Sequence, residues 1–326
     1  MGRTARAVRC VVRVVDPFVA LLLATLTLAS LVPASGRSAE VVSVAGTAAV
    51  SVLFFLSGAR LAPGSVLRGM TDWRLQLTIL AFTFVAFPLA GLAVSSVVAP
   101  LLSPELVVGV LFLSALPSVV QTSTAFTSLA GGNTAASVCA ASVSNLLGVV
   151  LTPVLLTMLT GSYAGVGAAS ALTIVVQILV PFVVGQLLHR RLGALLRRRA
   201  RVLRHVDRAA ILLIVYSAFG RAVLDGVWQR TGWGELALVT VLCAGLLGLA
   251  LTGTARAGRL LGLPRESRIP LLFCGSEKSL TTGLPIAAIL FTGPAAGVVV
   301  IPVIIYHQLQ LVVSALVARR LAPAVV

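Results

Sequence analysis

The sequence predicts an all-α integral membrane protein of about ten transmembrane helices, arranged as two inverted five-helix repeats with discontinuous fourth and ninth helices. Three observations favour this fold class. The chain is strongly apolar, its arginines gather on one side of the apolar runs, and polar patches interrupt two runs that lie five spans apart. Together they predict the number of spans and the depth at which a solute would bind.

Composition requires that most of the chain lie in lipid. Of 326 residues, 58% are hydrophobic and 10% are charged, with a mean hydropathy of +1.07. An ordinary soluble domain carries about 25% charged residues, which cover its water-facing surface. The net charge of +16 raises the alternative of a nucleic-acid partner. The arginines lie in short gaps between apolar runs, as membrane topology uses them, so no nucleic-acid partner is expected.

Ten apolar runs approach the length of about 20 residues that a membrane-spanning helix needs. The predicted spans are 15–33, 41–59, 75–99, 105–130, 134–160, 165–189, 208–226, 234–254, 268–292 and 296–318. The predicted organisation is a basic cytoplasmic N-terminus (1–14), a first repeat (15–163) and a second repeat (164–326) that contains a basic cytoplasmic connector (189–208).

The distribution of arginine predicts the orientation. Twenty-one arginines fall at the two termini and in the gaps 60–74, 190–208 and 256–268, which all lie on one side of a ten-span topology. The other side holds three: Arg37, Arg221 and Arg230. Positively charged loops stay in the cytoplasm, so both termini are expected there, with the protein in the plasma membrane. The connector at 189–208 can act as a topology signal or bind anionic lipid, and we favour the first role.

The first run has an alternative interpretation as a cleaved signal peptide. It combines a basic leader with an apolar stretch and small residues around 33–36. The leader is long, and cleavage would remove the five-plus-five symmetry. We therefore favour a retained first span.

The ninth run carries the chain's only lysine in the middle of an apolar segment. Lys278 follows Glu277, between Gly275 and the pair Gly283 and Pro285, which can interrupt a helix. A charge at mid-bilayer costs at least about 2.5 kcal/mol and usually faces a bundle interior or a water-filled cavity. Neighbours in a regular helix do not face each other, so a broken helix would let both charges address one cavity. The alternative is an internal ion pair that only holds helices together.

A second polar patch lies five spans earlier. The fourth run contains Pro117, Ser118 and Gln121, followed by hydroxyl residues up to Ser128. One or two hydroxyls could bond to their own helix backbone, but the patch holds more than that role needs. Equivalent interruptions in spans four and nine imply two repeats of five helices, and an odd number inverts the second. Secondary transporters bind solutes where broken helices of this kind meet near the midplane.

At these residues the sequence resembles the bile acid:sodium symporter family, in particular the branch related to sodium/bile acid cotransporter 7. The matching segments cover nearly the whole chain: 54–58 (FFLSG), 72–75 (DWRL), 84–89, 128–133 (SLAGGN), 142–145, 151–153 (LTP), 275–285 and 305–310 (IYHQLQ). The resemblance implies a panel domain of spans 1, 2, 6 and 7 and a core domain of spans 3–5 and 8–10. It also implies transport of organic anions with sodium by alternating access.

The resemblance implies two sodium sites, which this sequence matches unequally. The candidate ligands of the first are Ser123, Thr124, Ser137 and Glu277, with Asn145 compensating for Ala141 at a position where the family has a hydroxyl. At the second site, Thr83 and Leu280 stand where the family has glutamines. One hypothesis is therefore that Lys278 replaces a sodium ion, which would make transport proton-coupled or uncoupled.

Further hydroxyls complete the candidate substrate- or ion-binding set. Ser279 and Thr282 lie in the ninth-run patch and offer both donors and acceptors. His307 in the tenth run could relay protons, but a packed histidine is the favoured interpretation. No arginine lies in mid-span to bind an anion, so Lys278 and the positive ends of half-helices are the expected attractions.

These patterns predict a secondary active transporter of a small organic anion, with sodium as the candidate coupling ion and no other cofactor. The expected partners are the organic anion and the lipid bilayer. An enzyme is not expected, because the sequence has no Gly-x-Ser-x-Gly elbow, His-x-x-x-His pair or paired catalytic carboxylates. The alternative left open is a membrane protein that keeps the transporter fold and serves a regulatory role.

Overall fold

The computed structural model describes residues 17–60, 72–161, 175–224, 226, 232–291 and 295–322, and the regular elements within these residues are all helices. Five helices in these ranges are long and apolar enough to cross a membrane: Arg37–Arg60, Trp73–Leu101, Thr134–Thr160, Trp233–Leu260 and Ala296–Leu321. The bent pair Pro104–Ala115 and Val120–Leu129 makes a sixth if the two helices form one span. The chain is a multi-pass, all-helical membrane protein, as the sequence predicts.

Helical elements lie within each of the ten predicted runs. The first half contains α2 (Pro17–Leu31), α3 (Arg37–Arg60), α5 (Trp73–Ala81), the π-helix η1 (Phe82–Ala86), α6 (Phe87–Val98), the 3-10 turn η2 (Ala99–Leu101), α7 (Pro104–Ala115), α8 (Val120–Leu129) and α9 (Thr134–Thr160). The second half contains the π-helix η4 (Val175–Leu179), α11 (Val180–Leu187), α12 (His189–Arg198), α13 (Ala200–Leu224), α15 (Trp233–Leu260), α16 (Arg265–Ser276), α17 (Leu280–Leu290), α18 (Ala295–Val299) and α19 (Ile301–Leu321). The predicted N-terminal segment 1–14 and the start of the sixth run lie outside the described residues.

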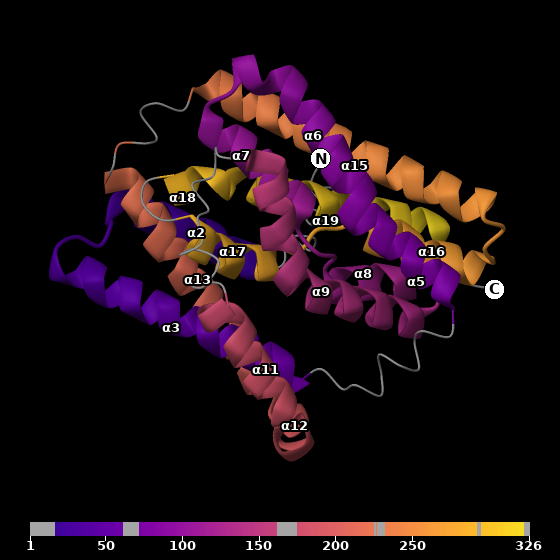
Figure 1. Cartoon of the computed structure of the whole chain (residues 1–326), viewed down its shortest axis with the longest axis horizontal. Coiled ribbons are helices and arrows are strands. Elements are labelled where there is room, and N and C mark those ends of the chain that lie inside the picture. Colours follow the sequence, from indigo (N-terminus) through magenta and orange to yellow (C-terminus); the bar gives the residue numbers. More distant parts are fainter. Residues whose placement is uncertain are drawn as a thin grey trace, which may run out of the picture.

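Four helices, called the panel from here on, pack together: α2, α3, α11 and α13. α3 packs along α11 and α13, and α2 packs along α13, on one side of the molecule (Figure 1). The approach of α3 to α11 requires glycine on both helices. A Cβ on Gly58 would overlap the carbonyl oxygen of Phe182, and a Cβ on Gly185 would overlap that of Phe55.

The helices from α5 to α9 and from α15 to α19, called the core from here on, gather around α7, α8, α9 and α17. α15 packs against α16 and α19, α6 packs against α7, and both α8 and α16 pack against α9 (Figure 1). Contacts between helix ends tie one edge of the core together. Ser267 Oγ donates to Asp72 Oδ2 at 3.1 Å, and Arg265 Nη2 donates to Leu321 O at 2.6 Å. These helix ends therefore lie together at one edge of the core.

Several predicted boundaries differ from the structure. The connector 189–208 is helical, because α12 occupies its first half and α13 begins at Ala200. α15 continues past the predicted end near 254 to Leu260, so Arg256 and Arg259 lie in its last turns. The tenth run is divided between α18 and α19. Arginine is a good helix former whose long side chain can reach water from an apolar edge, so these helices extend beyond their apolar runs.

Candidate functional site

The two interrupted helices cross at their breaks. The chain is extended over 116–119 between α7 and α8, and over 277–279 between α16 and α17. α7 and α8 bend by 57° at the first break. The Ser279 N–H donates to Pro117 O at 2.9 Å, which joins one break directly to the other. The crossing predicted from the two polar patches is present in the structure.

The causes of the two breaks differ from the prediction in one respect. Pro117 disfavours a helical conformation for the residue before it, and Leu116 is extended. Pro285 was expected to interrupt the ninth run together with Gly275 and Gly283, but Pro285 lies inside α17, and the two glycines also lie inside helices. They serve close packing instead, because a Cβ on Gly283 would lie 2.7 Å from Leu116 Cδ1 and one on Gly275 would lie 2.8 Å from Thr254 Cγ2.

Side chains of α9 satisfy the backbone groups that the first break exposes. The Ser118 N–H donates to Ser144 Oγ at 3.0 Å, and Asn145 Nδ2 donates to Ser118 O at 2.6 Å. Thr152 Oγ1 donates to Ala115 O at 2.9 Å. Buried backbone polar groups without partners are costly, so these bonds allow an unwound segment to exist at the depth of the membrane.

Side chains of α19 perform the same service for the second break. Gln310 uses both ends of its amide: Oε1 accepts from the Lys278 N–H at 2.8 Å, and Nε2 donates to Lys278 O at 2.9 Å. Tyr306 Oη donates to Ser276 O at 2.6 Å. His307 Nδ1 lies 2.9 Å from Gln310 Nε2, which places this histidine in support of the amide. The fifth helix of each predicted repeat thus holds the break in the fourth.

The side chain of Glu277 points from the second break toward α8 and is 1% exposed. Its Oε2 accepts hydrogen bonds from Thr122 Oγ1 at 2.7 Å and Ser123 Oγ at 2.8 Å. Its Oε1 is buried and has no hydrogen-bond partner, and the same holds for Ser118 Oγ at the neighbouring break. A buried acceptor without a donor is unfavourable unless a further group approaches it.

A second hydroxyl cluster lies where α8, α9 and α16 meet. Ser137 Oγ lies 3.5 Å from Thr124 Oγ1 and 3.2 Å from Cys274 Sγ, and it accepts from Thr127 Oγ1 at 3.4 Å. The long oxygen–oxygen distances show loosely connected hydroxyls. These residues, with Glu277 and its two donors, lie on facing parts of α8, α9 and α16 and make a largely buried, oxygen-rich group, called the Glu277 cluster from here on.

Lys278 points away from Glu277 and donates to backbone carbonyls. Nζ lies 2.9 Å from Thr83 O, 2.9 Å from Ser114 O and 2.8 Å from Leu116 O. It also lies 4.2 Å from the centre of the Phe87 ring. Glu277 and Lys278 therefore do not form the ion pair that was the alternative explanation of their presence in the ninth run. Among the described residues, the salt bridge is the one between Arg60 and Asp207.

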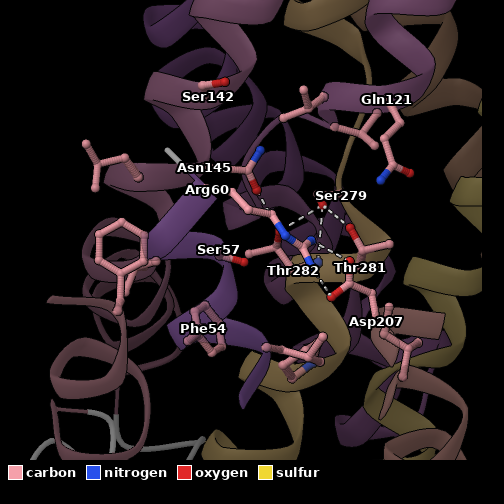
Figure 2. Close-up of a pocket in the computed structure, with 18 of the residues that line it drawn as sticks. Phe54, Ser57, Arg60, Gln121, Ser142, Asn145, Asp207, Ser279, Thr281 and Thr282 are labelled. Atoms are coloured by element: carbon pink, nitrogen blue, oxygen red, sulfur yellow. Dashed lines mark hydrogen bonds and ion pairs between the residues drawn. The ribbon is translucent and has the colours of Figure 1, made fainter. Parts of the chain in front are cut away.

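A cavity of about 380 Å³ lies between the panel and the core. Figure 2 shows the hydroxyls of Ser279, Thr281 and Thr282 at the beginning of α17, together with Asn145 of α9 and Gln121 of α8. The full lining is Leu53, Phe54, Ser57, Arg60, Val119, Val120, Gln121, Ser142, Asn145, Leu146, Val149, Phe182, Asp207, Arg208, Ile211, Ser279, Thr281, Thr282 and Pro285. The N-terminal ends of two half-helices, α8 and α17, therefore reach one cavity.

Hydrogen bonds fix the hydroxyls at the beginning of α17. Thr282 N–H donates to Ser279 Oγ at 3.2 Å, which makes Ser279 the N-cap. Thr282 Oγ1 donates to Asn145 Oδ1 at 2.6 Å, and Asn145 reaches Ser118 O with its other amide atom. Asn145 thereby connects both breaks to the cavity wall.

An ion pair lies on the panel side of the cavity. Arg60 at the end of α3 donates to both carboxylate oxygens of Asp207 on α13, at 2.5 and 3.2 Å, and Arg208 lines the cavity beside it. The arginine count assigned these arginines to surface loops and did not foresee them in the cavity wall.

The eight predicted site residues all lie around the crossing, in three groups. Ser123, Thr124, Ser137 and Glu277 share the Glu277 cluster, Asn145, Ser279 and Thr282 face the cavity, and Lys278 lies apart among carbonyls. The sequence did not identify Thr122, Cys274, Ser144, Gln310 or the Thr83 carbonyl as parts of the site. The amide in an apolar span was the available signal for Gln310, because such a group needs a partner.

Comparisons with known proteins identify the family. The model of the SBF-like CPA transporter family matches residues 16–323. A Pseudomonas aeruginosa protein, "Uncharacterized protein PA2026", is 48% identical over 94% of this chain and 93% of its own length. The Escherichia coli protein "Putative symporter YfeH" is 39% identical over the same shares, and Sodium/bile acid cotransporter 7 of Danio rerio is 28% identical over 82% of this chain and 80% of its own. The chain belongs to the SBF-like CPA transporter family, which is related to the bile acid:sodium symporters.

Proposed function

We propose that the protein is a secondary active transporter that moves a small organic anion through the cavity between panel and core by alternating access. The observation that carries this proposal is the crossing of two broken helices whose C-terminal halves, α8 and α17, begin at the cavity. In a bundle of continuous helices, only side chains would face the cavity. Broken helices also present unpaired backbone N–H groups and positive dipole ends to a ligand in the cavity.

The chemistry of the cavity suits an anion with an apolar body. Residues 119–121 and 279–282 bring the beginnings of α8 and α17 to its wall, where backbone N–H groups attract negative charge. Arg60, Arg208 and Asp207 together leave the panel wall with a net positive charge, although Arg60 is paired with Asp207. Apolar side chains such as Phe54 and Phe182 line the wall opposite the hydroxyls and match an apolar ligand body.

The proposed topology is ten spans in two inverted repeats, with both termini cytoplasmic in the plasma membrane. Two structural features support it: α9 and α19, five spans apart, each hold the break of the helix before them, and α2–α13 packing mirrors α3–α11 packing. Arg60 and Arg208 belong to the predicted cytoplasmic gaps. On this assignment the arginine end of the cavity faces the cytoplasm.

Sodium is the coupling ion that the Glu277 cluster fits. Its oxygen atoms suit a hard cation, and Glu277 Oε1 is a buried, unpartnered acceptor that a cation would satisfy. Ser123, Thr124, Ser137 and Glu277 would hold the ion, whose charge would offset that of the carboxylate. Thr122 and Ser123 already orient Glu277 by hydrogen bonds.

A screen followed by a flux assay tests the transport function. Purified protein is heated in the presence of carboxylates, sulfates and phosphates of graded size, with sodium present or replaced by choline. An anion that raises the Tm is then measured for counterflow in proteoliposomes. We expect at least one organic anion to stabilise the protein and to exchange across the membrane. Stabilisation without exchange of any tested solute would support the regulatory alternative and contradict transport.

A further inference from the structure

Lys278 has the surroundings of a coordinated cation. It is 1% exposed, and its Nζ donates to three backbone carbonyls from two separate parts of the core: Thr83 on η1 and Ser114 and Leu116 at the end of α7. The three distances of 2.8–2.9 Å are typical of charge-assisted hydrogen bonds. The Phe87 ring adds a cation–π contact at 4.2 Å.

Local backbone geometry makes these carbonyls available. Ser114 O lacks its usual helical donor, because the Ser118 N–H bonds to Ser144 Oγ instead. In η1 the Phe87 N–H bonds to Phe82 O in the π-helical pattern. The corresponding donor for Thr83 would be residue 88, which is proline and has no N–H. The C-terminal end of α7 also carries a negative partial charge, which favours a cation there.

The number of acceptors around Nζ favours the charged form of the side chain. An ammonium has three N–H donors, and a carbonyl oxygen can only accept. A neutral amine has two N–H groups, so its lone pair would face the third carbonyl oxygen. All three hydrogen bonds are therefore satisfied only by a protonated Lys278.

We propose that Lys278 is a tethered cation that permanently fills a carbonyl cation site at the helix crossing, which leaves the core room for at most one exchangeable cation, at the Glu277 cluster. A free alkali ion would use the same carbonyls, but the ammonium is covalently attached and cannot leave. The residues present do not fit a second sodium ion. The Lys278 ammonium already occupies the three carbonyl oxygens, Leu280 offers no side-chain ligand, and Glu277 is the buried carboxylate among the described residues.

The cation site itself is inferred from geometry, whereas its consequence for the charge moved per transport cycle rests on the proposed function. If the cycle carries one exchangeable cation with an anion, the charge moved per turnover is one less than for a two-cation cycle. The backbone of Lys278 is held on both sides by Gln310, so the ammonium stays at the crossing while the panel and core move.

Equilibrium binding of radioactive sodium to the purified full chain tests the proposal. Wild type is expected to bind one sodium ion per chain, and Glu277→Gln is expected to abolish that binding. Lys278→Met cannot donate hydrogen bonds and leaves three carbonyls open. It is expected to lose thermal stability in choline chloride, to regain part of it in sodium chloride at equal ionic strength, and to bind a second ion.

Two results would overturn the proposal. One is a wild-type stoichiometry of two sodium ions per chain, which decides the matter even if Lys278→Met fails to fold. The other is a folded Lys278→Met that binds no additional ion and whose Tm is the same in sodium and choline. Absence of solute flux would contradict the transport function but not the cation site, which is tested by the number of sodium ions bound per chain.

Discussion

We expect Gln310→Leu to destabilise the helix crossing by more than the loss of one hydrogen bond, because this one side chain bonds to two backbone groups. The amide of Gln310 is fully buried and bonds to both the N–H and the carbonyl of Lys278. Leucine has a similar size and keeps apolar contacts, but it removes both bonds to Lys278 and the contact of the amide with His307 Nδ1. The substitution therefore isolates the contribution of α19 to the unwound segment of the ninth predicted span.

The structure sets the expected magnitude. Two backbone groups at residue 278 would be left buried without partners, and each such group costs about 1–3 kcal/mol. The total of about 2–6 kcal/mol corresponds to a Tm decrease of roughly 4–12 °C, taking about 2 °C per kcal/mol for a chain of this size. Membrane proteins often unfold irreversibly, so variants are compared at one scan rate in one detergent.

A matched control lies two residues away on the same helix. Gln308 Nε2 is buried and has no hydrogen-bond partner. Gln308→Leu is therefore expected to leave the Tm unchanged or to raise it. Equal Tm values for Gln310→Leu and Gln308→Leu would refute the reasoning.

Two further predictions concern the cavity. Thr282→Val removes a hydroxyl bonded to the α9 amide at 2.6 Å, so the half-saturating concentration of a transported anion should rise about tenfold for a loss of roughly 1.4 kcal/mol. Thr240→Val, whose hydroxyl bonds to its own exposed helix, should match wild type in uptake, and equal values for all three proteins would contradict the cavity assignment. Arg60→Ala breaks an ion pair that is partly exposed, so stability should change by less than about 1 kcal/mol. Anion uptake by the Arg60→Ala variant, measured from the side of the membrane that the arginine end of the cavity faces, should nevertheless be slower than wild type at low salt and equal to it at high salt. A difference that does not depend on salt would argue against electrostatic attraction.

Local sequence features predicted the crossing because its causes are local. Pro117 forces the preceding residue out of the helix, and a buried lysine beside a glutamate in an apolar run requires a specialised environment. The polar residues of the fourth and ninth runs therefore located both breaks to within a few residues.

Features that depend on the approach of distant segments could not be predicted in the same way. The carbonyl of Thr83 became a partner of Lys278 through a π-helix that no composition signal marks. The packing of α3 on α13 brought Arg60 into the cavity wall, whereas the arginine count could say only on which side of the membrane it lies. Partner choice across helices is decided by tertiary packing, which one-dimensional periodicity does not encode.

Accessibility of the cavity from both sides of the membrane tests the central claim most directly. Thr281→Cys, made in a chain that also carries Cys10→Ser, places a thiol in the cavity wall, and the native cysteines among the described residues, Cys139, Cys243 and Cys274, are buried. An impermeant maleimide is applied to inside-out and right-side-out vesicles, with and without a transported anion. Alternating access from a cavity open toward the arginine end predicts rapid labelling in inside-out vesicles and slower, anion-dependent labelling in right-side-out vesicles. Labelling from one side alone under every condition would contradict the account.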